Sequence, residues 1–166
     1  MKNDMNEINI RKLESESDYD AIYDICVNAW KPVYDYRKQV MDIDIFTSIY
    51  KDGEENKANN VKDWCLKNAD KVMIATLDEQ VAGFITWEEY NSEVVELCNN
   101  AVDPSMHRKG VGTAMYNWFL KEMKSRGYLY TFVFTGLDEP HQPAKNAYQK
   151  MGFAMPIETV RFYKKL

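Results

Sequence analysis

The sequence predicts an α/β fold in which helices pack against a mixed β-sheet, and three observations support this class. Residues 8–13 begin with alternating apolar and polar side chains, which indicates a first strand because successive side chains of a strand point to opposite faces. Residues 72–75 and 81–87 read as two strands joined by a short polar turn. Two later segments, near residues 111–123 and 143–151, carry apolar residues at helical spacing.

Local signals predict further helices between the first strand and the hairpin. Ser17 and Asp20 resemble a helix-capping box, and Pro32 is expected to interrupt the helix that follows them. The polar and apolar pattern then predicts helices over residues 36–50 and about 56–69. Helices therefore precede the hairpin.

The second half of the chain continues the alternation of strands and helices. Residues 94–98 predict a third strand of the hairpin sheet, and Asn99 and Asn100 interrupt it, so a bulge is expected there. A strand is expected within residues 128–135, and a final strand over residues 160–163. This order fits one α/β domain over residues 1–166, a length that commonly corresponds to one domain.

Composition excludes several classes of protein. The 45% hydrophobic and 28% charged residues are typical of an ordinary globular chain rather than a disordered one. No apolar run reaches the roughly 20 residues of a membrane span, and no secretory signal is visible, so we expect a cytoplasmic protein without a membrane partner. Cys26, Cys65 and Cys98 lie far apart without metal-ligand spacing, so we expect free thiols and no metal.

Charge is distributed unevenly along the chain. Residues 1–83 carry 11 Lys and Arg against 17 Asp and Glu, whereas residues 84–166 carry 10 against 9. Because neither half has a basic stripe, we expect no nucleic-acid partner. The acidic half can steer a cationic substrate toward the protein, or it can be a solvated surface that aids solubility.

The segment from Val102 to Met115 carries the most specific signal. It reads as a strand, a turn with Gly110 and Gly112, and a helix. A helix N-terminus exposes free N–H groups and a positive dipole end, and glycine lets an anion approach them. A dinucleotide fingerprint needs glycine at Met115, and a P-loop needs lysine where Thr113 stands, so neither motif fits. The turn is either a phosphate site of another kind or merely flexible.

With its flanking residues, this turn resembles the phosphate-binding turn of the GNAT superfamily of acetyl-CoA-dependent N-acetyltransferases, Gln/Arg-x-x-Gly-x-Gly/Ala. His107 stands where that family has Gln or Arg, which leaves a side-chain role there open. Downstream, residues 141–153 resemble the family pattern Asn-x-x-Ala-x-x-x-Tyr-x-x-x-Gly-Phe, with His141 in place of Asn. The two motifs occur in the family's order, and the resemblance extends over residues 71–155.

The resemblance implies the GNAT fold, a mostly antiparallel central sheet with splayed central strands flanked by helices. It also implies transfer of acetyl from acetyl-CoA to a primary amine by direct attack in a ternary complex. The pyrophosphate would rest on backbone amides of residues 108–113, and the pantetheine would pair with the third strand. The acyl donor would then contact Ala101, Val102, His107, Arg108, Lys109, Gly110, Val111, Gly112, Thr113 and His141.

Two side chains are candidates for the acid–base chemistry. Glu96 lies six residues before Val102, where the family often has a glutamate that deprotonates the acceptor directly or through water. Tyr148 lies on the apolar stripe of the last helix, and the resemblance assigns it protonation of the departing thiolate. The alternatives are a surface carboxylate and a packing tyrosine. A covalent route through Cys98 is a further alternative.

The acceptor is not encoded in any recognisable signal. Polyamines, amino sugars, amino acids and protein N-termini all fit a small-molecule or peptide amine, with Tyr34 and Tyr36 as weak candidates for its site. Homodimers are common in the resembled family, and the oligomeric state stays open. Two other functions stay open as well: a non-catalytic acyl-CoA-binding regulatory module, and an unrelated nucleotide-binding domain for ATP or NAD.

Overall fold

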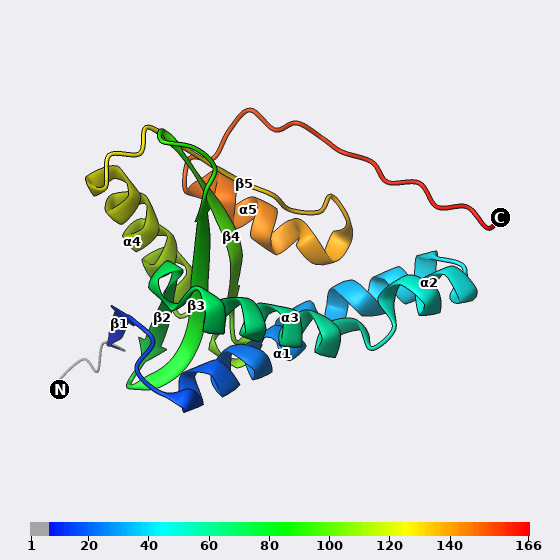
Figure 1. Cartoon of the computed structure of the whole chain (residues 1–166), viewed down its shortest axis with the longest axis horizontal. Helices are drawn as coiled ribbons and strands as arrows, with labels where there is room; N and C mark the ends of the chain where they lie inside the picture. Colours follow the sequence, from blue (N-terminus) through cyan, green and yellow to red (C-terminus); the bar gives the residue numbers. More distant parts are fainter. Residues whose placement is uncertain (1–6) are drawn as a thin grey trace.

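The computed structural model describes residues 7–166 (Figure 1) and confirms the α/β class. None of the helices in this range is long and apolar enough to cross a membrane. Short 3-10 turns lie at Ala69–Lys71, Pro104–Met106 and Glu139–His141. The main elements in chain order are β1 (Ile8–Arg11), α1 (Glu16–Val40), α2 (Ile43–Tyr50), α3 (Gly53–Lys67), β2 (Val72–Leu77), β3 (Gln80–Glu89), β4 (Val94–Val102), α4 (Val111–Ser125), β5 (Tyr130–Val133) and α5 (Gln142–Lys150).

The sheet has the strand order β1-β2-β3-β4-β5. Each pair from β1 to β4 is antiparallel, whereas β4 and β5 are parallel. The last pair between β4 and β5 joins Leu97 to Val133, where β5 ends. Residues 98–102 of β4 therefore continue without pairing to β5, and the two strands part as the resemblance implied.

Two apolar layers sandwich the sheet. Phe84 packs with side chains of α1 and α3 such as Ile22 and Val61, whereas Ile85 packs with Phe119 of α4. The side chains of these neighbouring β3 residues thus lie on opposite faces of the sheet, as the two-residue period of a strand requires. Each face of the central strands is covered by helices, and functional side chains must reach solvent near the ends and edges of these strands.

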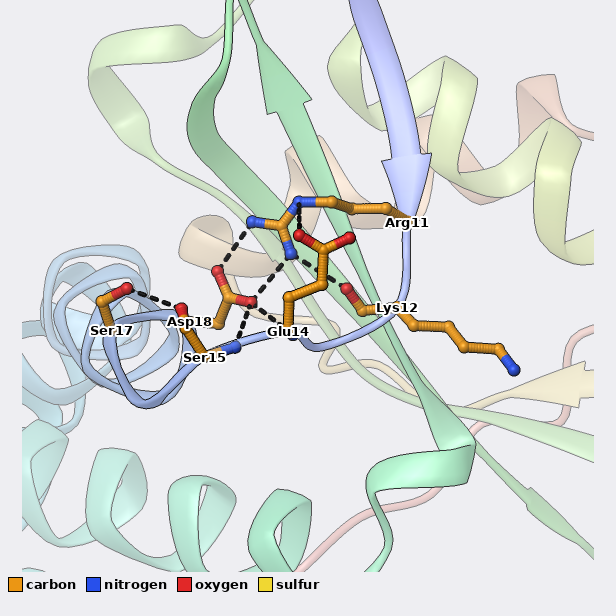
Figure 2. Close-up of polar contacts among 6 residues, drawn as sticks. All are labelled: Arg11, Lys12, Glu14, Ser15, Ser17 and Asp18. Carbon is orange, nitrogen blue, oxygen red and sulfur yellow. Dashed lines mark hydrogen bonds and ion pairs between the residues drawn. The ribbon is translucent and has the colours of Figure 1, made fainter.

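A partly buried ion pair, in which Asp18 is the buried member, joins β1 to α1 (Figure 2). The guanidinium of Arg11 donates to both carboxylate oxygens of Asp18, at 2.8 and 2.7 Å, and the N–H of Glu14 donates to Asp18 at 2.8 Å. The hydrogen bonds from Arg11 hold the pKa of Asp18 below its ordinary value. The N-cap of α1 is Ser15, so the capping box predicted at Ser17 and Asp20 is wrong by two residues.

The helix α1 does not end at Pro32, contrary to the sequence-based prediction. It continues to Val40, and Asp42 then caps α2 by accepting the N–H of Asp44 at 3.0 Å. The helix predicted over residues 36–50 is therefore two helices. Proline removes one hydrogen bond from a helix interior. Pro32 is exposed, so the carbonyl group that it leaves unpaired can bond to water.

The final strand predicted over residues 160–163 is also wrong. The C-terminal arm, defined here as residues 156–166, runs away from the sheet toward α2 (Figure 1). The hydroxyl oxygens of Tyr163 and Tyr50 lie 2.7 Å apart, and Lys165 forms an ion pair with Asp44 at 2.7 Å. A strand needs a neighbouring strand to satisfy its backbone, and these contacts with α2 keep the arm away from the sheet.

Candidate active site

A bulge in β4 marks the place where β4 and β5 part. Thr86 of β3 faces two residues of β4, Cys98 and Asn99, as the shifted register shows. The hydroxyl of Thr86 donates to the carbonyl oxygen of Asn99 at 2.9 Å. The bulge expected from the asparagine pair is therefore present, one residue earlier than that pair. Beyond it, backbone groups on one edge of β4 have no strand partner from β5.

Asn99 and Asn100 lie on opposite faces of the sheet, and the extra residue of the bulge puts Asn100 on the same face as Leu97. Asn99 accepts a 2.7 Å hydrogen bond from Lys57 of α3. Asn100 contacts the tyrosines of α4 and α5 on the other face. Leu97 shares that second face, since it packs in the core beneath α4. Because side chains alternate along a strand, Glu96 lies on the face of Lys57.

Tyr116 of α4 and Tyr148 of α5 meet at the side-chain amide of Asn100. The Tyr116 hydroxyl donates to Asn100 Oδ1 at 2.8 Å, and the Tyr148 hydroxyl lies 3.2 Å from Oδ1 and 3.1 Å from Nδ2. Both tyrosines are buried, and burial raises the pKa of each phenol. Tyr148 therefore keeps its proton at neutral pH.

Sequence reasoning did not find Asn100 and Tyr116 as partners of Tyr148. Tyr116 lies three residues before Phe119, a core residue of α4, so its helical spacing could have placed it on the buried stripe. No signal in the sequence indicates that Asn100 receives both hydroxyls. This contact depends on the bulge, which determines the face on which Asn100 lies.

Glu96 lies one residue before the last pair of β4 and β5. It faces Glu88 across the β3–β4 ladder. Burial, followed by the like charge of Glu88, raises the pKa of Glu96 above its ordinary value. Glu96 and Tyr148 thus lie on opposite faces of β4, near the point where the sheet opens.

Cys98 lies on the face of Glu96 and does not suit covalent catalysis. Burial and the neighbouring carboxylates raise the pKa of its thiol to about 12. A nucleophilic cysteine needs a lowered pKa, because the thiolate is the reactive form. Within the described part of the chain, no three His, Cys, Asp or Glu side chains gather in an arrangement that could hold a metal ion.

The turn after β4 is open to solvent and has an unusual backbone conformation. Arg108 and Gly110 adopt positive φ angles of 61° and 89°, in the left-handed region. The helix α4 begins at Val111, and its first N–H groups have no acceptor within the helix. The exposed residues His107 to Gly110 leave the backbone of this turn accessible from outside.

Side chains around the turn have different surroundings. The ring of His107 contacts its own loop, with Nε2 3.2 Å from the carbonyl oxygen of Val102. Lys109 Nζ lies 3.5 Å from the sulfur of Met106. A Cβ atom on Gly112 would lie 3.7 Å from Val102, an ordinary contact, so the protein itself does not require glycine there.

The remaining donor-site candidates lie on β4 and at α5. Ala101 and Val102 are half-buried, in the part of β4 that β5 does not pair. His141 precedes α5, and its Nδ1 forms a hydrogen bond with Asp138. The ring of His141 packs against Gly136, where any Cβ atom would clash with it. The 3-10 turn that contains His141 packs against α1.

Comparison with known proteins assigns the family. A model described as the acetyltransferase (GNAT) family matches residues 37–153, more than half of the chain. The chain belongs to the GNAT acetyltransferase family. This GNAT protein is therefore an acyltransferase, and the resemblance predicted from the two sequence motifs is confirmed. No curated protein sequence matches the chain.

Solved structures share the fold of this GNAT protein at low sequence identity. The PaiA N-acetyltransferase from Thermoplasma acidophilum, in complex with coenzyme A, is 19% identical with a TM-score of 0.68, over 90% of this chain and 91% of that chain. Ard1 from Thermoplasma volcanium is 21% identical with a TM-score of 0.64, over 90% and 84%. The aminoglycoside N-acetyltransferase AAC(6')-Iy, also in complex with coenzyme A, is 19% identical with a TM-score of 0.55, over 96% and 95%.

Proposed function

We propose that this protein transfers an acetyl group from acetyl-CoA to a primary amine by direct attack in a ternary complex. Residues 1–166 would form one acetyltransferase domain for this reaction. The observation that carries the proposal is the opening between β4 and β5, which ends at an exposed turn and the N-terminus of α4. Acetyl-CoA supplies an activated thioester and a diphosphate that the chain can hold at these two places.

The turn has the properties of a diphosphate site. The backbone amides of residues 108–113 surround a helix N-terminus, which favours negative charge. Gly110 is needed for its positive φ, while Gly112 is not required by any protein neighbour and leaves room for a ligand. Arg108 and Lys109 are exposed and can add positive charge. His107 would contribute its backbone, since its ring is engaged by Val102.

The unpaired part of β4 suits the amide-containing arm of the donor. Ala101 and Val102 can offer backbone N–H and C=O groups along this edge, as one strand offers them to another. Val111 and Thr113 complete the helix N-terminus next to them. We place His141 at the donor as well, with Asp138 fixing its ring orientation.

Glu96 is proposed as the general base and Tyr148 as the general acid. An amine with a pKa near 10 arrives as an ammonium ion, which the net charge of −5 attracts. Glu96 takes a proton from it, directly or through water, and its raised pKa brings the carboxylate closer to the required basicity. The neutral amine attacks the thioester carbonyl, the C–S bond breaks, and Tyr148 donates its proton to the departing thiolate while Asn100 holds its hydroxyl in place. The second proton that the nitrogen loses as the amide forms returns the tyrosinate to the phenol through solvent.

A thiol-release assay over a panel of small-molecule and peptide amines tests this function. We expect acetyl-CoA turnover with at least one amine, and a strong loss in Glu96→Gln. Of the three ligands coenzyme A, ATP and NAD, calorimetry should detect binding only for coenzyme A. Binding without turnover on any amine would instead support the regulatory module, and a preference for ATP or NAD would indicate an unrelated nucleotide-binding domain. The cytoplasmic location and the lack of a nucleic-acid partner stay predictions from the sequence.

A further inference from the structure

Lys57 of α3 reaches the face of β4 that carries Glu96. Its Nζ donates to Asn99 Oδ1 at 2.7 Å and lies 5.2 Å from the centre of the Trp30 ring. Over residues 7–166, no carboxylate pairs with this ammonium group; its neighbours include the neutral thiols of Cys26 and Cys98 and the like-charged Arg37. Burial lowers the pKa of Lys57, because a charge loses hydration there.

The bulge brings opposite charges to one face of β4. Glu88 and Glu96 stand at one end, and Lys57 reaches the other end at Asn99. Three residue steps of a strand separate Glu96 from Asn99, which is about 10 Å between their backbones at most. Side chains that converge over Cys98 therefore present a negative and a positive group within reach of one small molecule.

We propose that this face binds an acceptor amine that also carries a carboxylate, such as an amino acid. The ammonium group of the acceptor would lie at Glu96 and its carboxylate at Lys57. This assignment rests on the proposed acetyl transfer and adds the class of acceptor. Asn99 and Trp30 hold the Lys57 ammonium at the site, and an anionic ligand group supplies the countercharge that the chain does not provide.

Matched acceptors test this assignment. Amino acids and their decarboxylated amines differ only in the carboxylate, so the ratio of their kcat/KM values measures the contribution of that group. We expect the wild-type protein to prefer the amino acids. The ratio should fall about 10- to 100-fold in Lys57→Met and recover in part in Lys57→Arg. Lys62→Met, a control on the same helix whose ammonium group pairs with Asp20 of α1, should keep the wild-type ratio.

The outcomes separate the two levels of inference. If decarboxylated amines are acetylated as well as amino acids, or if Lys57→Met keeps the wild-type ratio, the carboxylate site is overturned while the acetyltransferase function stands. If the wild-type protein binds coenzyme A but acetylates no amine, the proposed function fails, and the carboxylate site fails with it.

Discussion

Replacing Tyr148 with phenylalanine removes one hydroxyl and keeps the ring. That hydroxyl lies 3.1 Å from Asn100 Nδ2 and 3.2 Å from Oδ1, and the ring packs on Phe153 with centres 5.8 Å apart. Loss of a buried hydrogen bond should lower the free energy of unfolding by about 1–2 kcal/mol. Loss of a general acid should lower kcat by about 10- to 1,000-fold, or roughly 1.4–4 kcal/mol of activation free energy.

Tyr116→Phe is the matched control for this prediction. Its hydroxyl donates to the same Asn100 oxygen at 2.8 Å from an equally buried ring, so it should cost similar stability. Its kcat should fall much less, because Tyr116 is not assigned a proton transfer. Steady-state kinetics, urea unfolding and calorimetry with coenzyme A measure the three quantities. Affinity for coenzyme A should stay near wild type in both variants.

The pH profile adds an independent check. Burial raises the pKa of Tyr148 above its ordinary value of about 10, so the acid form persists at neutral and mildly alkaline pH. We therefore expect kcat of the wild-type protein to show no alkaline loss below about pH 10 from this group. Unchanged turnover in Tyr148→Phe, or equal losses in the two phenylalanine variants, would remove Tyr148 from the mechanism.

Three further predictions concern other parts of the chain. Asp18→Ala should lower the free energy of unfolding by about 3 kcal/mol at pH 7, because it leaves the Arg11 guanidinium without its buried partner. Since Arg11 lowers the pKa of Asp18, this contribution is fully present above the ordinary Asp pKa of about 4 and is lost as the pH falls through the lowered pKa; a difference in urea unfolding that did not shrink with falling pH would contradict it. Glu96→Gln should lower kcat/KM about 100-fold or more. It should also remove the acid limb of the pH–rate profile, whose midpoint lies above the ordinary pKa of a glutamate because the pKa of Glu96 is raised. An acid limb that remains in the variant would assign the base to another residue. A Cβ atom at Gly112 meets only ordinary contacts, so Gly112→Val is a mild change whose fold is checked by circular dichroism. It should weaken coenzyme A binding about tenfold or more by calorimetry, and wild-type affinity would move the diphosphate away from the turn.

Much of the fold could be predicted from local patterns. The hairpin, α4 and α5 agree with the expected elements, because each has a strong apolar period with a turn or glycine at its end. Two errors have one cause: Pro32 and the predicted strand at residues 160–163 were interpreted by local propensity, while neighbouring elements decided both outcomes. An exposed proline is tolerated within a long packed helix, and an extended segment without a partner strand forms no ladder.

The candidate site was predictable where a single segment builds it. Gly110 and Gly112 could be placed at a helix N-terminus from sequence alone, since strand, turn and helix follow one another directly. Glu96 and Tyr148 could be named from motif positions. Their location on opposite faces of β4 could not, because a single bulged residue reverses the faces of every side chain beyond it.

The sequence by itself determined the glycine-containing turn between strand and helix, the order of elements from the hairpin to α5, and the family, because these depend on backbone preferences and spacings within short segments. Only the tertiary structure decided that Asn100 receives the hydroxyls of Tyr116 and Tyr148, and that Lys57 reaches Asn99. Each of these contacts joins elements far apart in the chain. Their geometry depends on how the bulge orients β4 between its two helical layers, which no local pattern encodes.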